Sequence, residues 1–246
     1  QSCAELAALL RKRRFAGGAL DLEVPEVEIV LDGESRMTGL TTRIYDESHQ
    51  MIEEFMVSAN EAVATELQSR GIDILSRLHE PPAPDRLEEC TMQLVKLGFR
   101  PGNLSERRNM AAFLRSTAVH PLRSHVHMLL LRSMKRALYS AQDSGHFGLA
   151  KAHYAHFTSP IRRYPDLVLH RQLAKYLLRP NAAKLPAAYL QETADMVNES
   201  EFNADDASRQ LVEIKKFRFL QQQLDSRNPL CYDAVVVKCT SFGAFI

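Results

Sequence analysis

The chain has 246 residues, 45% of them hydrophobic and 25% charged, which is typical of a globular protein with one large domain, or one domain plus a fragment. It contains no uninterrupted apolar run of membrane-spanning length and no secretion signal at its start, so we expect a cytoplasmic, monomeric protein with no membrane partner. The formal net charge is only +1, yet residues 19–99 carry a net charge of −11 and residues 100–179 one of +11, which indicates a phosphate-binding surface unless the two segments pair with each other.

The N-terminal third is predicted to combine a short helix, antiparallel strands and a long helix. The short helix covers residues 5–14 and ends at a pair of glycines. Alternating apolar and polar residues predict two or three antiparallel strands within residues 19–45. Apolar residues at helical spacing then predict an amphipathic helix over residues 52–67, with Ser48 as its N-cap.

The remainder is predicted to be mostly helical. Helices are expected over residues 84–98, 105–117, 121–139, 161–178, 186–202 and 204–224. Residues 145–158 are expected to be extended, and residues 231–246 are strand-like with a turn at Ser241-Phe-Gly243. Together these elements predict an α+β fold that is rich in helices.

The most informative stretch runs from His153 to Arg171. Thr158-Ser-Pro160 predicts a turn, because a proline disfavours the helical conformation of the residue before it. The helix that follows presents Arg162 and Arg163 in its first turns. Two guanidinium groups beside a turn suit phosphate oxygens, so the stretch points to nucleic acid. The alternative is a pair of surface cations at a helix start.

The same residues resemble a known family. The string from Gly145-His-Phe-Gly-Leu-Ala150 through His156-Phe-Thr-Ser-Pro-Ile-Arg-Arg-Tyr-Pro-Asp-Leu167 to His170-Arg171 resembles the signature of the RNB catalytic domain of the ribonuclease II/R exoribonucleases. The resemblance extends to four further stretches and covers nearly the whole chain: Gly18–Glu23, Met51–Asn60, His120–Lys135 and Glu201–Arg209. It implies the RNB catalytic-domain fold, helix-rich with antiparallel strands near the N-terminus.

The resemblance also implies a division of the chain. Residues 1–228 would be the C-terminal part of the RNB catalytic domain, without its N-terminal metal-binding part. Residues 229–246 resemble the first two strands of an S1-type oligonucleotide-binding (OB) barrel, which two strands cannot close. We therefore expect the chain to be a fragment at both ends.

The resemblance implies an exoribonuclease that degrades single-stranded RNA processively from 3′ to 5′ and releases nucleoside 5′-monophosphates. Members of the family use Mg²⁺ held by clustered aspartates, which we expect upstream of this chain. The fragment would then carry the half of the active site that holds the RNA phosphates, and would not hydrolyse RNA efficiently alone. The alternative is an RNB-like RNA-binding or regulatory protein without hydrolytic activity.

Five residues are candidates for the site by their match to family positions. Arg162 is expected to contact the phosphates near the scissile bond and support catalysis, and Arg163 to hold the next phosphate. Glu201 is expected near the catalytic centre. Glu53 would lie by the terminal nucleotide, with a solvated helix face as an equal alternative. Tyr164 would stack on the RNA, or else belong to the core.

The histidines and the other acidic residues favour structural roles. His146, His153, His156 and His170 lack the spacing of a zinc site, and no cysteine is near them, so hydrogen-bonded or core histidines are expected and no metal ligand is assigned. Asp166 is expected to anchor an arginine at the start of the helix. Glu54 is also expected to be structural.

Overall fold

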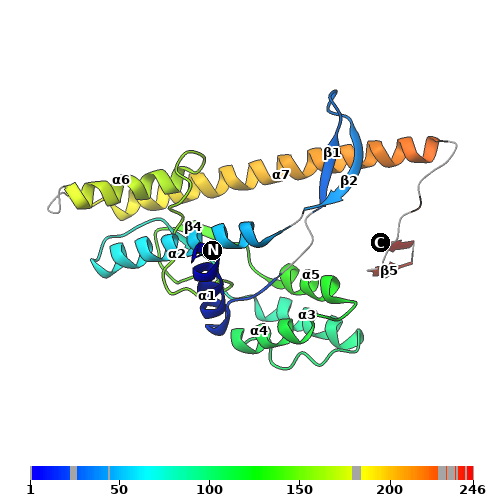
Figure 1. Cartoon of the computed structure of the whole chain (residues 1–246), viewed down its shortest axis with the longest axis horizontal. Helices are drawn as coiled ribbons and strands as arrows, with labels where there is room; N and C mark the ends of the chain where they lie inside the picture. Colours follow the sequence, from blue (N-terminus) through cyan, green and yellow to red (C-terminus); the bar gives the residue numbers. More distant parts are fainter. Residues whose placement is uncertain are drawn as a thin grey trace. The chain divides into compact units, whose positions relative to one another are not determined.

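The structure is a computed structural model that describes residues 2–22, 27–43, 45–178 and 184–226, together with residues 231, 236, 238–241 and 243–245. It divides into two compact units. Unit 1 comprises Gln1–Glu23 and Tyr45–Phe202, and unit 2 comprises Val24–Ile44 and Asn203–Ile246. Figure 1 shows the elements of both units in sequence colours.

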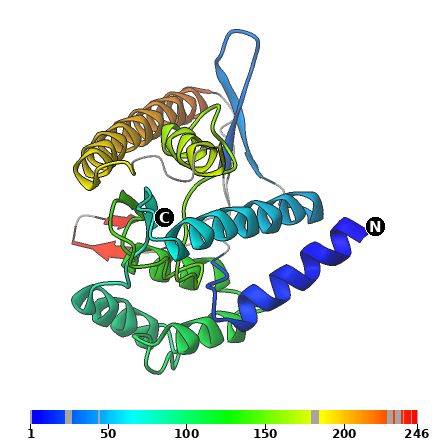
Figure 2. The ribbon, with the colours of Figure 1, turned by 90° about the vertical axis from the view of Figure 1, so that its left-hand side faces the viewer.

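Unit 1 is built mostly from helices. Its elements are α1 (Ser2–Ala16), α2 (Glu47–Ser69), β3 (Ser76–Leu78), α3 (Pro84–Lys96), α4 (Arg107–Ser116), α5 (Arg123–Ser133), β4 (Leu138–Ser140), α6 (Tyr164–Leu178) and the first part of α7 (Ala187–Asp225). In Figure 2 α1 lies along α2, against which it packs. The helices and the short antiparallel strands confirm the predicted helix-rich α+β class.

The predicted cap of α2 was wrong by two residues. Asp46, in an extended conformation, is the N-cap, and its carboxylate accepts a hydrogen bond from the backbone N–H of His49 at 3.1 Å. Ser48 donates its own hydroxyl to the same carboxylate at 2.6 Å. A carboxylate is also favoured at this end by the helix dipole, so Asp46 is the better cap.

A two-stranded antiparallel sheet replaces the end of one predicted helix. The helix expected to reach residue 139 ends at Ser133, because Met134 adopts an extended conformation. Residues 138–140 then form β4 and pair with β3, which the sequence patterns did not predict. Strands of three residues carry no detectable periodicity, and their pairing spans about sixty residues of chain.

The two C-terminal helices also differ from their predicted bounds. α6 begins at Tyr164, so Arg162 lies in the preceding turn and Arg163 immediately before the helix, and neither is in the helix. The two helices predicted over residues 186–224 are one continuous helix of 39 residues, α7. No glycine or proline lies between residues 187 and 225, so no residue forces a break there.

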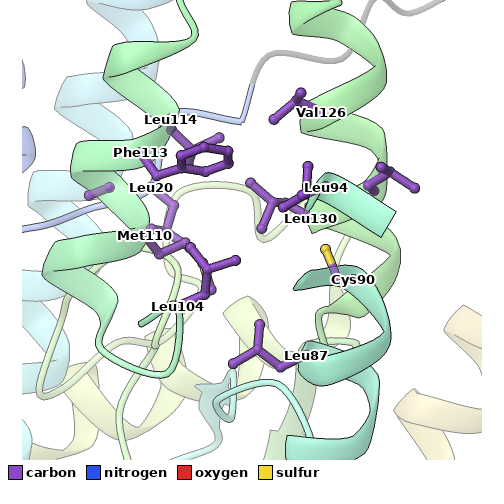
Figure 3. Close-up of a cluster of buried hydrophobic side chains, with 12 residues drawn as sticks. Leu20, Leu87, Cys90, Leu94, Leu104, Met110, Phe113, Leu114, Val126 and Leu130 are labelled. Atoms are coloured by element: carbon purple, nitrogen blue, oxygen red, sulfur yellow. The ribbon is translucent and has the colours of Figure 1, made fainter. Parts of the chain in front are cut away.

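Unit 1 has three clusters of buried apolar side chains. One joins α3, α4 and α5 and includes Leu94, Met110 and Leu130, as Figure 3 shows. A second centres on Leu67 and Leu169 of α2 and α6. The third lies around Tyr139 of β4, with residues of α6 and α7. The second and third clusters hold β4, α6 and α7 in place, and β3 joins them through its pairing with β4; these elements carry the site described below.

Unit 2 contains two hairpins and the second part of α7. β1 (Val27–Leu31) pairs antiparallel with β2 (Met37–Thr42). The sequence predicted two or three antiparallel strands here, and the described residues form two. Lys215 Nζ of α7 donates a hydrogen bond to the carbonyl oxygen of Ser35 between them at 2.6 Å. β5 (Lys238–Thr240) pairs with β6 (Gly243–Phe245) around the predicted turn. The proposed boundary at residues 228–229 lies outside the described residues.

No helix in the described part of the chain is both long and apolar enough to cross a membrane.

Candidate functional site

A turn at residues 160–162 precedes α6, and the carboxylate of Asp166 holds it in place. Asp166 is completely buried. Its Oδ1 accepts hydrogen bonds from the backbone N–H of Ser159 and from Arg163 Nη2, both at 2.8 Å, and its Oδ2 accepts one from Arg163 Nε at 2.9 Å. The predicted anchoring of an arginine by Asp166 is therefore confirmed. The Asp166 carboxylate contacts one edge of the Arg163 guanidinium, formed by Nε and Nη2. The expected contact between Arg163 and a phosphate stays a prediction.

Arg162 differs from Arg163 in having no such anchor. Its side chain is exposed, and none of the described residues forms a hydrogen bond or an ion pair with its guanidinium group. Ile161 beside it is also fully exposed. The buried Asp166 thus fixes the base of the turn while the turn itself presents Arg162 to solvent with all its N–H donors available. This is the arrangement that a phosphate-binding arginine requires.

Glu201 of α7 is joined to this region through β3 and β4. It forms a bidentate ion pair with Arg77, with Nη1–Oε2 and Nη2–Oε1 distances of 2.8 and 3.0 Å. Arg77 lies directly opposite Tyr139 in the sheet, with its guanidinium 4.4 Å from the centre of the tyrosine ring. The Tyr139 hydroxyl hydrogen-bonds to Nδ1 of His156 at 2.7 Å. A chain of contacts therefore links Glu201 to the segment that leads into the Arg162 turn.

Burial decides which groups in this chain of contacts carry charge. Burial, followed by the positive charges of Arg163 and Arg77, lowers the pKa of His156 to about 3. Burial also raises the pKa of Tyr139 to about 12. Both groups are thus neutral at physiological pH. The positive charge around the turn belongs to its arginines.

Acidification is expected to destabilise the fold through His156. Above its ordinary pKa of 6.5 the imidazole is neutral in both states, but between pH 6.5 and about 3 the unfolded chain binds a proton that the folded chain does not. The free energy of unfolding should therefore fall as the pH falls, by about 2 kcal/mol at pH 5 for this group. Denaturant unfolding at pH 7 and pH 5 measures the loss.

His156→Gln removes the titrating imidazole and should make the loss between pH 7 and pH 5 smaller by about the same 2 kcal/mol. His125→Gln is the matched control, since His125 lies on α5 and is only partly buried. An equal loss in the wild type and in His156→Gln would show that His156 is not the group responsible.

The other histidines are hydrogen-bonded, as predicted. Nδ1 of His146 accepts from the backbone N–H of Leu149 at 3.2 Å, and Nε2 of His170 donates to the carbonyl oxygen of Phe157 at 2.8 Å. His153 pairs with Asp143. Within the described ranges no three His, Cys, Asp or Glu side chains are grouped so as to hold a metal ion.

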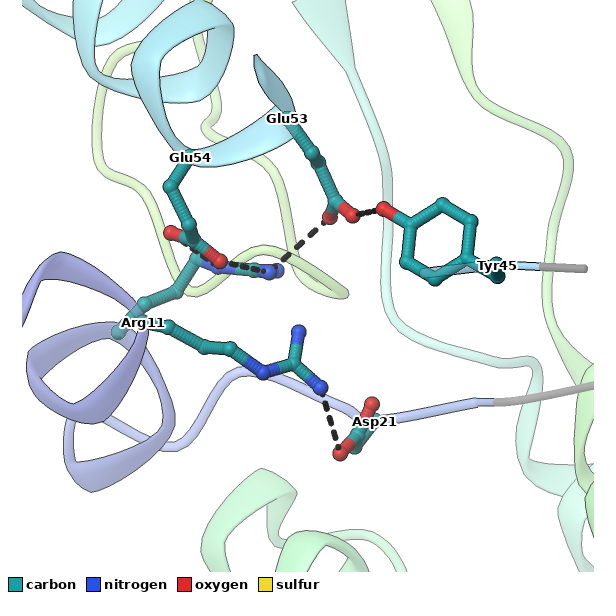
Figure 4. A network of polar contacts seen from close by, with 6 residues as sticks. Arg11, Asp21, Tyr45, Glu53 and Glu54 are labelled. Carbon is teal, nitrogen blue, oxygen red and sulfur yellow. Dashed lines mark hydrogen bonds and ion pairs between the residues drawn. The ribbon is translucent and has the colours of Figure 1, made fainter. Parts of the chain in front are cut away.

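Glu53 belongs to a polar network between α1 and α2, drawn in Figure 4. The buried Arg14 donates to Glu53 Oε1 from Nη2 at 3.0 Å, and from Nε to both oxygens of the buried Glu54 at 3.0 and 3.1 Å. The hydroxyl of Tyr45 donates to the other oxygen of Glu53. Glu54 is therefore structural, as predicted. Glu53 is not a free solvated carboxylate, and its contact with a terminal nucleotide stays a prediction.

Tyr164 and Leu22 lie in different surroundings. Tyr164 is 40% exposed, so the alternative of a core position was wrong, and its stacking on RNA stays a prediction. A hydrogen bond with Tyr189 raises its pKa. Leu22 lines a cavity of about 530 Å³ with Met134 and His146. An apolar contact is available there.

Sequence reasoning missed Arg77, Tyr139 and Asn60. Asn60 donates from Nδ2 to the Tyr154 hydroxyl at 3.0 Å, and its Oδ1 accepts from the backbone N–H of Phe157 at 2.9 Å. Asn60 closes the Met51–Asn60 motif, which was a signal that could have found it. Arg77 and Tyr139 had no such signal, because their importance arises from the pairing of β3 with β4.

The chain is similar to known proteins over most of its length. The family model of the RNB domain matches residues 1–179. Ribonuclease R of Thermotoga maritima is 38% identical over an alignment that covers 98% of this chain and 35% of that protein. Ribonuclease R of Escherichia coli is 33% identical over an alignment that covers 98% of this chain and 31% of that protein. The chain thus spans about a third of the length of these curated relatives.

Solved structures share the fold. Mycoplasma genitalium RNase R in complex with ribose-methylated single-stranded RNA has a TM-score of 0.85 and 31% identity, covering 90% of this chain and 36% of that one. The same protein in complex with double-stranded RNA has a TM-score of 0.84 and 30% identity, and the match covers 91% of this chain and 41% of that one. Yeast Ssd1, described as a pseudonuclease, gives 0.59 at 22% identity, covering 80% of this chain and 25% of that one. This last likeness concerns the fold alone.

Proposed function

The chain belongs to the RNB domain family, and from this premise we propose that it forms part of an exoribonuclease that degrades single-stranded RNA. We propose further that degradation is processive, runs from the 3′ end and releases nucleoside 5′-monophosphates. The relatives named ribonuclease R and the RNA complexes of the Mycoplasma protein support RNA as the ligand. The observation that carries the proposal is the exposed guanidinium of Arg162, with which none of the described residues pairs, on a turn fixed by the buried Asp166.

Each candidate residue has a role in this proposal that its geometry allows. Arg162 would neutralise the phosphate at the scissile bond, where negative charge on the oxygens grows in the transition state. Arg163 would steady the backbone from an anchored position through its Nη1 group. Glu201, with 28% of its side chain exposed, keeps carboxylate lone pairs available to the substrate.

The magnesium expected for the family has no counterpart in the part of the chain that the structure describes, since no suitable group of ligands is found there. These residues do not fit a magnesium site, so no step of the mechanism is derived through the metal. A magnesium requirement remains a proposal for the whole protein, with ligands to be sought elsewhere.

The test is a degradation assay with the whole protein in which this chain occurs. Single-stranded RNA labelled at its 5′ end should be converted to a short 5′-terminal product with little accumulation of intermediates, and uniformly labelled RNA should release nucleoside 5′-monophosphates. RNA blocked at its 3′ end should persist. Internal cleavage products, or degradation of the 3′-blocked RNA, would contradict the proposed direction.

The second candidate function is RNA binding without hydrolysis. The same assay separates the two functions: RNA that is bound with a salt-dependent affinity but stays intact in the presence of magnesium would support the second candidate.

A further inference from the structure

Glu201 poses an electrostatic problem in the proposed function. A carboxylate that lies beside a chain of phosphates repels it, and two unit charges a few ångströms apart near a protein surface interact by more than about 1 kcal/mol. A negative residue in an RNA-binding site therefore requires compensation. The bidentate ion pair with Arg77 supplies a positive charge at hydrogen-bonding distance from both carboxylate oxygens.

We propose that Arg77 is the positioning residue of the site: it orients Glu201 and cancels the repulsion between that carboxylate and the RNA. The proposal rests on the proposed function, and it adds a residue that acts through Glu201 rather than by touching the substrate. Only 13% of the Arg77 side chain is exposed, against 28% for Glu201. The carboxylate therefore faces the solvent more openly than its partner.

Two contacts hold Arg77 in place for this role, and two hydrogen bonds fix the tyrosine over which it lies. Its backbone N–H donates to the carbonyl oxygen of Tyr154 at 2.8 Å. Its guanidinium lies over the ring of Tyr139, its direct cross-strand partner. Tyr139 in turn is held at both backbone groups by Asn198 of α7, which accepts from its N–H and donates to its carbonyl oxygen, each at 2.8 Å. Arg77 and Glu201 are thus fixed by the same pairing of β4 with α7.

The same contacts tie Arg77 to the phosphate-binding turn. Tyr139 hydrogen-bonds to His156, whose pKa is lowered first by burial and then by nearby positive charges that include Arg163, Arg77 and Arg162. These guanidinium groups therefore act on one small region. With Arg77 paired to Glu201, the net positive charge that faces an approaching phosphate comes from Arg162 and from the open side of Arg163.

The experiment is a charge-compensation cycle measured by the binding of labelled single-stranded RNA. Arg77→Met leaves Glu201 uncompensated and should weaken binding about tenfold. Glu201→Gln removes the negative charge, leaves the positive charge of Arg77 uncompensated, and should strengthen binding. In the double variant both charges are gone, and affinity should return to within about twofold of the wild type.

Arg70→Met is the matched control, because Arg70 also pairs with a glutamate, Glu66, and also lies over a tyrosine ring, that of Tyr176. It should bind RNA like the wild type. Circular dichroism and thermal unfolding of every variant show whether the fold is kept.

Recovery in the double variant is the decisive result. If the double variant stays as weak as Arg77→Met, Arg77 binds RNA directly or merely supports the fold, and the proposal is overturned. Unchanged binding by Arg77→Met would also overturn it. Failure of the proposed function can be distinguished from failure of the role of Arg77. In that case the wild-type protein itself would show no salt-dependent RNA binding.

Discussion

The Arg162→Ala variant is expected to bind single-stranded RNA about tenfold more weakly than the wild-type protein, the loss of one charge-assisted contact with phosphate. The side chain of Arg162 is exposed and none of the described residues pairs with its guanidinium, so its removal breaks no hydrogen bond or ion pair within the described structure. The dependence of the logarithm of affinity on the logarithm of salt concentration should also become shallower by about one unit. Fluorescence anisotropy across a salt series measures both effects.

Arg86→Ala is the control for Arg162→Ala. Arg86 is an exposed arginine of α3, and its contact with Glu89 is long, at 3.9 Å. Its loss removes the same charge away from the turn and should change RNA affinity by less than about twofold. Equal effects of the two substitutions would show that only the total charge matters, and would remove the main support for the site.

The buried ion pair between Arg14 and Glu54 is expected to matter for the stability of the fold. Arg14→Met is expected to lower the free energy of unfolding by about 3–5 kcal/mol, because it leaves the carboxylate of Glu54 buried without its partner. Glu54 has only 2% of its side chain exposed, and Arg14 only 6%. Urea unfolding followed by circular dichroism measures the change.

Arg11→Met is a closely matched control, since Arg11 lies one turn earlier on α1 and both guanidinium groups are 4.6 Å from the centre of the Phe15 ring. Arg11 pairs with Asp21 at 3.5 Å at a more exposed position, so its loss should cost less than about 1 kcal/mol. A double variant, Arg14→Met with Glu54→Leu, should recover much of the loss because no buried charge remains. Similar destabilisation by Arg11→Met and Arg14→Met would contradict the assignment.

Local patterns in the sequence predicted most helices well. α2, α3 and α4 carry apolar residues at helical spacing and begin or end near recognisable caps, so their existence follows from short-range information. The ends were less predictable, as Asp46 in place of Ser48 shows. The continuity of α7 was missed, although no glycine or proline between residues 187 and 225 interrupts a helix.

The candidate site was predictable in part. Its motif identified Arg162, Arg163 and Asp166, since these residues are close in sequence and their types match the family signature. The different states of the two arginines were not predictable. They depend on Asp166 being buried and turned back toward Ser159, which is a property of the packed turn.

By itself the sequence determined the family, the helix-rich fold class and the positions of the candidate residues, because periodicity and motif spacing are properties of neighbouring residues. The tertiary structure decided which charges are free and which are paired. Arg77 meets Glu201 across more than a hundred residues of chain, and only the pairing of β3 with β4 and the packing of α7 bring them together. Desolvation and ion pairing depend on such long-range contacts, so the electrostatic character of the site appears only in the folded chain.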